Sequence, residues 1–202
     1  MLGDEKTDAT LDLSSVDPRR CALLVIDALG DPTGGPLEGA LLEPTVNCGR
    51  LAHAARACGI PVIFANDAHI PGLDRELELW GPHGIAGSPE AQTSPQLDQQ
   101  PEDFVIEKRR YSGFFQTSLQ LLLDELGADT LICCGFDTNI CVRHTVADAY
   151  FLNLGTIVVA DATATFLVGD QESGLDYLST CYATALVSTD QAIALMEGAP
   201  AL

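Results

Sequence analysis

The chain alternates short runs of consecutive apolar residues with longer amphipathic segments. The apolar runs are uninterrupted, which is typical of strands buried on both faces of a parallel sheet. The segments between them have helical spacing, and several end at a glycine. The pattern predicts strands at residues 21–27, 60–66, 103–108, 130–136, 156–161 and 184–188, and helices at about 44–58, 114–126, 138–154, 171–182 and 189–197. Strands that alternate with helices in this way predict one three-layer α/β/α domain.

Two stretches fall outside this alternation. Residues 1–18 are expected to form an extended N-terminal arm, ahead of a single domain over residues 19–202. Residues 67–101 form one long connection that is rich in proline, glycine and polar residues. A connection of this length inside a compact α/β domain usually carries function. It follows a strand, at the edge where open parallel sheets bind their ligands, so we expect the functional site there.

The composition narrows the possible partners. The 202 residues include 29 Asp and Glu against 10 Lys and Arg, for a formal net charge of -19. Such a charge repels nucleic acid and anionic membrane surfaces, so neither is an expected partner. An excess of acidic residues is also typical of proteins from salt-loving hosts and of GC-rich genomes, and the sequence does not separate these two origins. No apolar run has the length of a membrane span or the form of a signal peptide. The seven cysteines include no CxxC pair, and we therefore expect a cytoplasmic protein with reduced thiols.

Three residues that can carry chemistry stand at the ends of predicted strands. Asp27 ends the first strand, and Lys108, one of two lysines, ends the third. Their ordinary alternatives are a carboxylate that caps the following turn and a solvated lysine. Cys141 follows the strand at 130–136, in the expected first turn of a helix, where the helix dipole lowers the pKa of a thiol. Its alternative is a buried core cysteine.

These three side chains form a reactive set if they meet at one edge of the sheet. Asp27 can accept the thiol proton, and Lys108 can stabilise the thiolate and keep the carboxylate ionised. That combination supports attack of Cys141 on an amide-type carbonyl, followed by hydrolysis of the acyl-enzyme by water. The spacing makes the meeting possible without establishing it.

Four segments of the chain resemble the isochorismatase-like cysteine hydrolases, a superfamily that includes nicotinamidases and N-carbamoylsarcosine amidases. They are IDALGD, VIEKRRYSGFFQTSL, GFDTNICVRHTVADA and VVADATAT, and the likeness spans about residues 20 to 190. The resemblance implies a Rossmann-like parallel six-stranded sheet of order 3-2-1-4-5-6 and an Asp–Lys–Cys triad at Asp27, Lys108 and Cys141. It also implies a cis peptide bond between Phe136 and Asp137 and an oxyanion hole made by the backbone N–H groups of Asp137 and Cys141.

The long connection holds a candidate metal site. Asp67 and His69 form an Asp-x-His pair at a strand end, and His83 follows later, which gives three possible ligands. Their alternative is an ordinary set of solvated loop residues. The resemblance to nicotinamidases implies a divalent ion, zinc first, on these three residues, and no organic cofactor. It also makes Trp80 a candidate stacking wall for a flat substrate.

Other side chains near these positions have candidate roles. Tyr111 and Phe136 are expected to bind substrate beside Trp80. Arg109, Arg110 and Arg143 are expected to be solvated or interfacial residues, although one of them could attract an anionic substrate group. The resemblance further implies a homo-oligomer, either a dimer or a tetramer.

The predicted function is a cysteine-dependent amidohydrolase that cleaves the C–N bond of a small carboxamide and releases ammonia. The first strand reads DALGDP where the family commonly has DMQ-x-D-F, so Leu29 and Pro32 replace a glutamine and an aromatic residue. This departure leaves the substrate open between a nicotinamidase-like amide and an N-carbamoyl or ureido compound. Two further alternatives are a non-catalytic binding member of the fold and a metal-dependent hydrolase in which Cys141 has no role.

Overall fold

A computed structural model of the chain describes residues 10–198. Its centre is a six-stranded parallel sheet of order β3-β2-β1-β4-β5-β6, which confirms the predicted fold class and strand order. The strands are β1 (Cys21–Ile26), β2 (Val62–Asp67), β3 (Phe104–Lys108), β4 (Thr130–Phe136), β5 (Gly155–Ala164) and β6 (Ala185–Val187). The helices are α1 (Glu38–Ala57), α2 (Glu76–Trp80), α3 (Leu119–Leu126), α4 (Arg143–Phe151), α5 (Gln171–Tyr182) and α6 (Thr189–Met196).

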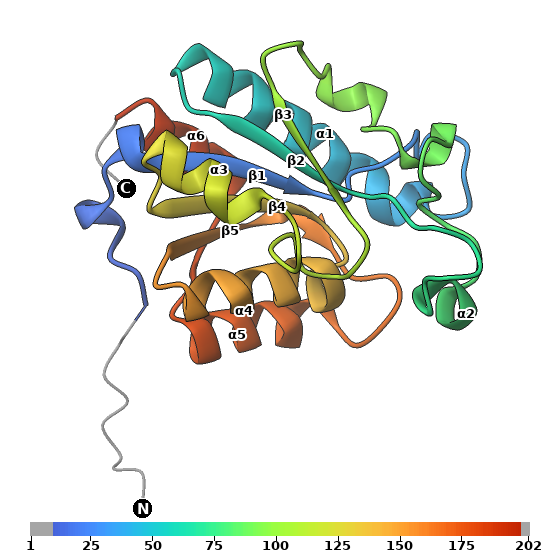
Figure 1. The fold of residues 1–202 in the computed structure, drawn as a ribbon. Coiled ribbons are helices and arrows are strands. Elements are labelled where there is room, and N and C mark those ends of the chain that lie inside the picture. The colour runs from blue at the N-terminus through green and yellow to red at the C-terminus, as the bar shows by residue number, and fades with distance from the viewer. Residues whose placement is uncertain (1–9, 199–202) are drawn as a thin grey trace, which may run out of the picture.

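Helices cover both faces of the sheet (Figure 1). One core cluster joins β-strand side chains to α1 and α6, with Leu51 and Met196 among its members. The other joins the opposite face of the sheet to α3, α4 and α5, and it includes Leu123 and Val146. All six residues of β1 are buried, as are all seven of β4. Because the central strands are covered on both sides, their sequences are continuously apolar, as the pattern predicts.

Two helices, α1 and α3, begin at other residues than the sequence predicts. α1 begins at Glu38 and contains Pro44, the residue at which we expected it to start. α3 begins at Leu119, because side-chain hydroxyls bond the preceding backbone: Phe114 N–H donates to Ser112 Oγ, and Leu119 N–H donates to Thr117 Oγ1. Such local bonds compete with helix formation.

The segment after β4 also differs from its prediction. It begins as a π-helical turn over Thr138–Val142 and continues as α4. A π-helical turn inside a helix is rare and often marks a functional site.

The two ends of the chain are described only in part. Residues 1–9 of the expected arm lie outside the described residues. Residues 10–18 contain a short 3-10 turn at Leu13–Ser15, and Leu11, Leu13 and Val16 pack against the core. Among the described residues, no helix is long and apolar enough to cross a membrane.

The long connection between β2 and β3 stands at the carboxyl ends of the strands. It contains α2, a helix of five residues that the sequence pattern did not predict. In Figure 1, α2 projects from the end of the sheet, apart from the two helical layers. The backbone of the connection folds back on β2: His69 N–H donates to Gly84 O, and Ala86 N–H donates to His69 O. These bonds hold the connection against the carboxyl edge of the sheet, where the functional site is expected.

Candidate active site

The ends of four neighbouring strands bring the candidate residues to one edge. Asp27 directly follows β1, while Asp67 ends β2 and Lys108 ends β3. Asp67 and Lys108 are partners in the parallel register of β2 and β3. Cys141 reaches the same edge from the π-helical turn that follows β4. Parallel strands end on the same side of their sheet, and for this reason residues more than a hundred positions apart become neighbours.

Lys108 lies at the centre of this group. Its Nζ is 2.6 Å from Asp27 Oδ2, 2.5 Å from Asp67 Oδ1 and 3.6 Å from Cys141 Sγ. Asp67 N–H donates to Asp27 Oδ1 at 2.8 Å, which fixes the Asp27 carboxylate. Asp27 has a φ of 49°, a left-handed conformation that is uncommon for residues with a Cβ and that recurs at functional sites. The structure therefore brings together the three side chains of the predicted triad.

Burial and neighbouring charges set the protonation of the group. Burial, and then the charge of Asp67, raise the pKa of Asp27 to about 7. Burial raises the pKa of the Cys141 thiol well above its ordinary value, although Lys108 opposes this shift. Burial alone would lower the pKa of Lys108. The negative charges of the nearby carboxylates outweigh the effect of burial, so the pKa of the ammonium group lies well above its ordinary value. The sequence prediction of a lowered thiol pKa is therefore wrong, because burial outweighs the helix dipole and the lysine.

The resting site that follows from these shifts is a neutral thiol, a lysine cation and a carboxylate poised near neutral pH. Cys141 Sγ and a carboxylate oxygen of Asp27 lie within 4.8 Å of each other. A base whose pKa lies near the working pH is well suited to proton transfer. The geometry allows Asp27 to take the thiol proton as sulfur attacks, beside the positive charge of Lys108.

The turn that carries Cys141 is fastened to the loop at residues 165–170. Asp137 Oδ2 accepts hydrogen bonds from two backbone N–H groups of this loop, at 2.8 and 3.0 Å. Asn139 Nδ2 donates to three acceptors in the same loop. Its Oδ1 accepts from Arg143, one turn further on. These contacts hold the turn that carries Cys141 in one position relative to β5 and α5.

The expected cis peptide bond is absent. Among residues 10–198 no peptide bond is cis, so the bond between Phe136 and Asp137 is trans and the prediction is wrong. A cis bond before a residue other than proline costs about 3–4 kcal/mol. Here the chain enters the turn without it: Asp137 is extended, at φ -76° and ψ 143°, and its side chain accepts from Asn139 N–H. The backbone N–H groups of Asp137 and Cys141 stay the predicted oxyanion donors.

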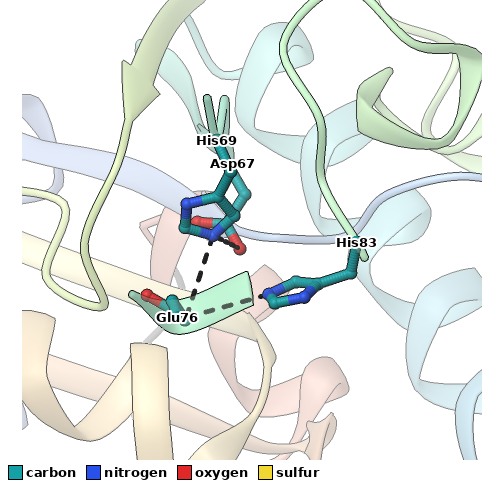
Figure 2. Close-up of side chains that lie close together, drawn as sticks. All are labelled: Asp67, His69, Glu76 and His83. Atoms are coloured by element: carbon teal, nitrogen blue, oxygen red, sulfur yellow. Dashed lines mark ion pairs between the residues drawn. The ribbon is translucent and has the colours of Figure 1, made fainter. Parts of the chain in front are cut away.

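A second cluster of four side chains adjoins the first. Figure 2 shows Asp67 and His69 side by side, with Glu76 and His83 directed toward them. One donor atom from each lies within 4.8 Å of the others. Glu76 Oε1 is 3.8 Å from His69 Nε2 and 3.8 Å from His83 Nε2. Glu76, on α2, is the fourth donor that the sequence analysis missed.

The cluster has the properties of a metal-binding set. Both ring nitrogens of His69 are buried without a hydrogen-bond partner, which is costly unless another group completes them. His83 Nδ1 lies 2.8 Å from Gly81 O, so Nδ1–H can donate there and leave Nε2 free to bind an ion. Asp74 Oδ2 stands 3.7 Å from His69 Nδ1, on the side of the ring away from Nε2. Carboxylate and imidazole donors in this arrangement fit a divalent cation such as Zn²⁺.

The predicted substrate-binding aromatic residues divide between two places. Trp80 Nε1 donates to Tyr111 Oη at 3.0 Å, and both side chains pack against the core cluster that contains Cys141. Phe136 is buried in the other core cluster, where its ring contacts that of Phe166. The structure therefore brings Trp80 and Tyr111 together and places Phe136 apart from them.

Fold and site together define a class of α/β hydrolase with a buried Asp–Lys–Cys group at the carboxyl edge of a parallel sheet. The family model described as "Isochorismatase domain" matches residues 21–191. Ureidoacrylate amidohydrolase RutB of Pseudomonas savastanoi pv. phaseolicola is 32% identical in an alignment of 174 residues, and the match covers 72% of this chain and 71% of that protein.

Solved structures give the same assignment. N-carbamoylsarcosine amidase from Thermoplasma acidophilum superposes with a TM-score of 0.77 at 33% identity, covering 85% of this chain and 97% of the other. Nicotinamidase PncA from Bacillus subtilis superposes with a TM-score of 0.73 at 27% identity, covering 84% and 99%. The chain belongs to the isochorismatase family of hydrolases, which confirms the resemblance noted in the sequence.

Proposed function

We propose that this protein is a cysteine-dependent amidohydrolase that acts on a small carboxamide or N-carbamoyl compound and releases ammonia. The observation that carries the proposal is the buried thiol of Cys141, which lies within 4.8 Å of a carboxylate oxygen of Asp27 and 3.6 Å from Lys108 Nζ. These three groups supply a nucleophile, a base and a fixed positive charge. The non-catalytic alternative gives no reason to keep a lysine and two carboxylates buried together, at the cost of several kcal/mol per buried ion.

The reaction proceeds in two half-reactions. Asp27 takes the thiol proton, Cys141 Sγ bonds to the carbonyl carbon, and the carbonyl oxygen becomes an oxyanion held by the N–H groups of Asp137 and Cys141. Protonated Asp27 then gives its proton to the leaving nitrogen, and the C–N bond breaks to leave a thioester. Water attacks the thioester, Asp27 accepts a proton from it, and the acid departs as the thiol is restored.

Both substrate branches fit this chemistry. With a primary carboxamide the leaving group is ammonia itself. With an N-carbamoyl compound the amine leaves first, and hydrolysis of the carbamoyl-enzyme gives carbamate, which decomposes to ammonia and carbon dioxide. The names of the relatives support both branches, since one is a nicotinamidase, one a ureidoacrylate amidohydrolase and one an N-carbamoylsarcosine amidase.

We propose further that Asp67, His69, Glu76 and His83 hold one divalent metal ion, with zinc as the first candidate. When bound, such an ion supplies charge that orients the substrate carbonyl or the hydrolytic water. The test has a readout separate from activity: metal content measured by plasma mass spectrometry after dialysis. Wild-type protein is expected to keep close to one ion per chain, and His83→Ala to lose it. Equal metal content in both proteins contradicts the assignment.

The decisive experiment on the function compares wild type with Cys141→Ala on nicotinamide, pyrazinamide, N-carbamoyl amino acids and ureido acids, with ammonia release as the readout. We expect wild-type turnover on one branch and none from the variant. Turnover that Cys141→Ala retains would favour a metal-dependent hydrolysis without the thiol. If the wild type releases no ammonia from any of these substrates, a binding role would be favoured. Cytoplasmic location and a dimeric or tetrameric state stay predictions, the latter measurable by light scattering.

A further inference from the structure

A cavity of about 460 Å³ opens beside the candidate metal cluster. It is lined by Arg75, Glu76, Glu78, Leu79, Arg110 and Tyr111. Two of these residues tie it to the site: Glu76 belongs to the four-residue cluster, and Tyr111 accepts the hydrogen bond of Trp80. The cavity is thus an extension of the candidate active site, built mainly from α2 and the segment after β3.

The positive charges around this cavity are notable in so acidic a chain. Of the 10 lysines and arginines, Arg75 and Arg110 line the cavity: Arg75 directly precedes α2, and Arg110 follows Arg109 in the segment after β3. A net charge of -19 repels any anion that approaches, so an anionic ligand needs local cations to bind.

The guanidinium groups of both cavity arginines have unused donors. Among residues 10–198, the Arg75 guanidinium has no ion pair and no hydrogen bond. Arg110 uses Nη1, which donates to Asp74 Oδ1 and to Arg109 O. Asp74 also pairs with Arg109 at 2.7 Å. One carboxylate therefore neutralises only one of the two guanidinium groups, and this group of three side chains keeps a net charge of one positive unit.

The acidic residues of the cavity do not cancel this charge directly. Glu76 is directed at His69 and His83. Glu78 is exposed and makes no ion pair with Arg75 or Arg110 within the described part of the chain. Leu79, which is 65% exposed, adds an apolar surface beside the charged groups. The combination of free guanidinium donors, a tyrosine ring and an apolar wall fits a small organic acid, because a guanidinium binds a carboxylate through two parallel hydrogen bonds.

We propose that this cavity is the subsite for a carboxylate of the substrate, bound by Arg75 and Arg110. The inference rests on the proposed amidohydrolase function and deepens it: the substrate is an N-carbamoyl or ureido acid, whose carbamoyl group reaches Cys141 while its carboxylate lies between the two arginines. A neutral carboxamide such as nicotinamide leaves both guanidinium groups without a partner.

The test compares 3-ureidopropionate with N-propylurea, which has the same carbamoyl group and no carboxylate. The variants are Arg75→Gln and Arg110→Gln. Arg50→Gln is the matched control, because it also removes one exposed arginine charge, in a surface pair with Asp190. The ratio of kcat/KM for the acid to kcat/KM for the neutral urea is expected to fall about 10- to 100-fold in each test variant, as for loss of a hydrogen bond to a charged group. Arg50→Gln is expected to keep the wild-type ratio.

Calorimetric binding to Cys141→Ala protein separates this subsite from the proposed function. The inference requires that 3-ureidopropionate bind more tightly than N-propylurea, and that Arg75→Gln abolish the difference. Binding with this preference but no wild-type hydrolysis would overturn the amidohydrolase and keep the subsite. Equal affinity for both compounds, or better wild-type turnover of nicotinamide than of any ureido acid, would overturn the subsite. Arg75→Gln carries the test if Arg110→Gln fails to fold, since the exposed Arg75 guanidinium makes no hydrogen bond or ion pair within residues 10–198.

Discussion

Replacing Lys108 by methionine isolates the role of one buried charge. The lysine is 1% exposed, and its Nζ lies within 2.6 Å of Asp27 and 2.5 Å of Asp67. Methionine has a similar length and apolar stem, so the substitution preserves most of the packing and removes the cation. Two buried carboxylates then face each other with no counter-charge.

The size of the effect follows from that arrangement. Removing one partner of a buried ion pair costs about 3–5 kcal/mol, because the remaining charge is left uncompensated. For a domain of this size each kcal/mol shifts Tm by about 2–4 °C, so Lys108→Met should lower Tm by about 6–20 °C. The assay is thermal and urea unfolding followed by circular dichroism, on chelator-treated protein, so that no bound cation substitutes for the lysine.

A double-mutant cycle tests the cause. Adding Asp27→Asn to Lys108→Met removes one of the two stranded carboxylates and should recover about 1–3 kcal/mol as a coupling energy. Cys141→Ala is the matched control, because it removes a group 3.6 Å from the same Nζ without changing the buried carboxylates. A Lys108→Met protein within 1 kcal/mol of wild type, taking ~1 kcal/mol as the size of an ordinary substitution, would refute the reasoning, as would strict additivity of the two substitutions.

Three other predictions follow from single contacts. Asn139→Ala should lower kcat by about tenfold while Tm shifts by only a few degrees, because the substitution frees the turn that carries Cys141 from the loop at 165–170. Equal losses in kcat and stability would show a purely structural role. Gly135→Ala should cost about 3 kcal/mol or more in urea unfolding, since its φ is +109° and a Cβ would lie 1.9 Å from Ile26 O. Burial raises the pKa of Cys133 to about 12, so at pH 8 about one thiol in ten thousand is ionised. Mass spectrometry should therefore find alkylation at the exposed Cys58 and Cys181 before Cys133.

The sheet could be predicted from the sequence because continuous apolar runs have one common cause, burial on both faces. Helix starts were harder, because they depend on local competition. The hydroxyls of Ser112 and Thr117 bond backbone N–H groups ahead of α3, and no periodicity in the sequence reveals that. The π-helical turn at Thr138–Val142 likewise depends on Asp137 and Asn139 bonding a distant loop.

The candidate site could be predicted where strands deliver its residues. Asp27, Lys108 and Cys141 stand at or just beyond strand ends, so the topology alone places them together. Glu76 could not be predicted in the same way, because it belongs to a five-residue helix whose position is set by tertiary contacts. One of those is the pairing of Asp74 with the arginines that follow β3. The only signal in the sequence was that Glu76 lies midway between His69 and His83.

Asp67 belongs to both parts of the site, and this decides which variant can separate them. Its Oδ1 accepts from Lys108 Nζ, while its Oδ2 stands 3.4 Å from His69 Nε2. Asp67→Asn therefore changes the charge balance of the thiol group and the metal donors at once. His83→Ala removes one donor and leaves every contact of Lys108 in place. If the two parts contribute separately, wild-type protein treated with a chelator should have the same residual rate as untreated His83→Ala protein. Treating the His83→Ala protein with the chelator should lower its rate no further. Asp67→Asn should fall well below both. A rate for Asp67→Asn equal to that of His83→Ala would mean that the carboxylate serves the metal site alone, and the shared role would be wrong.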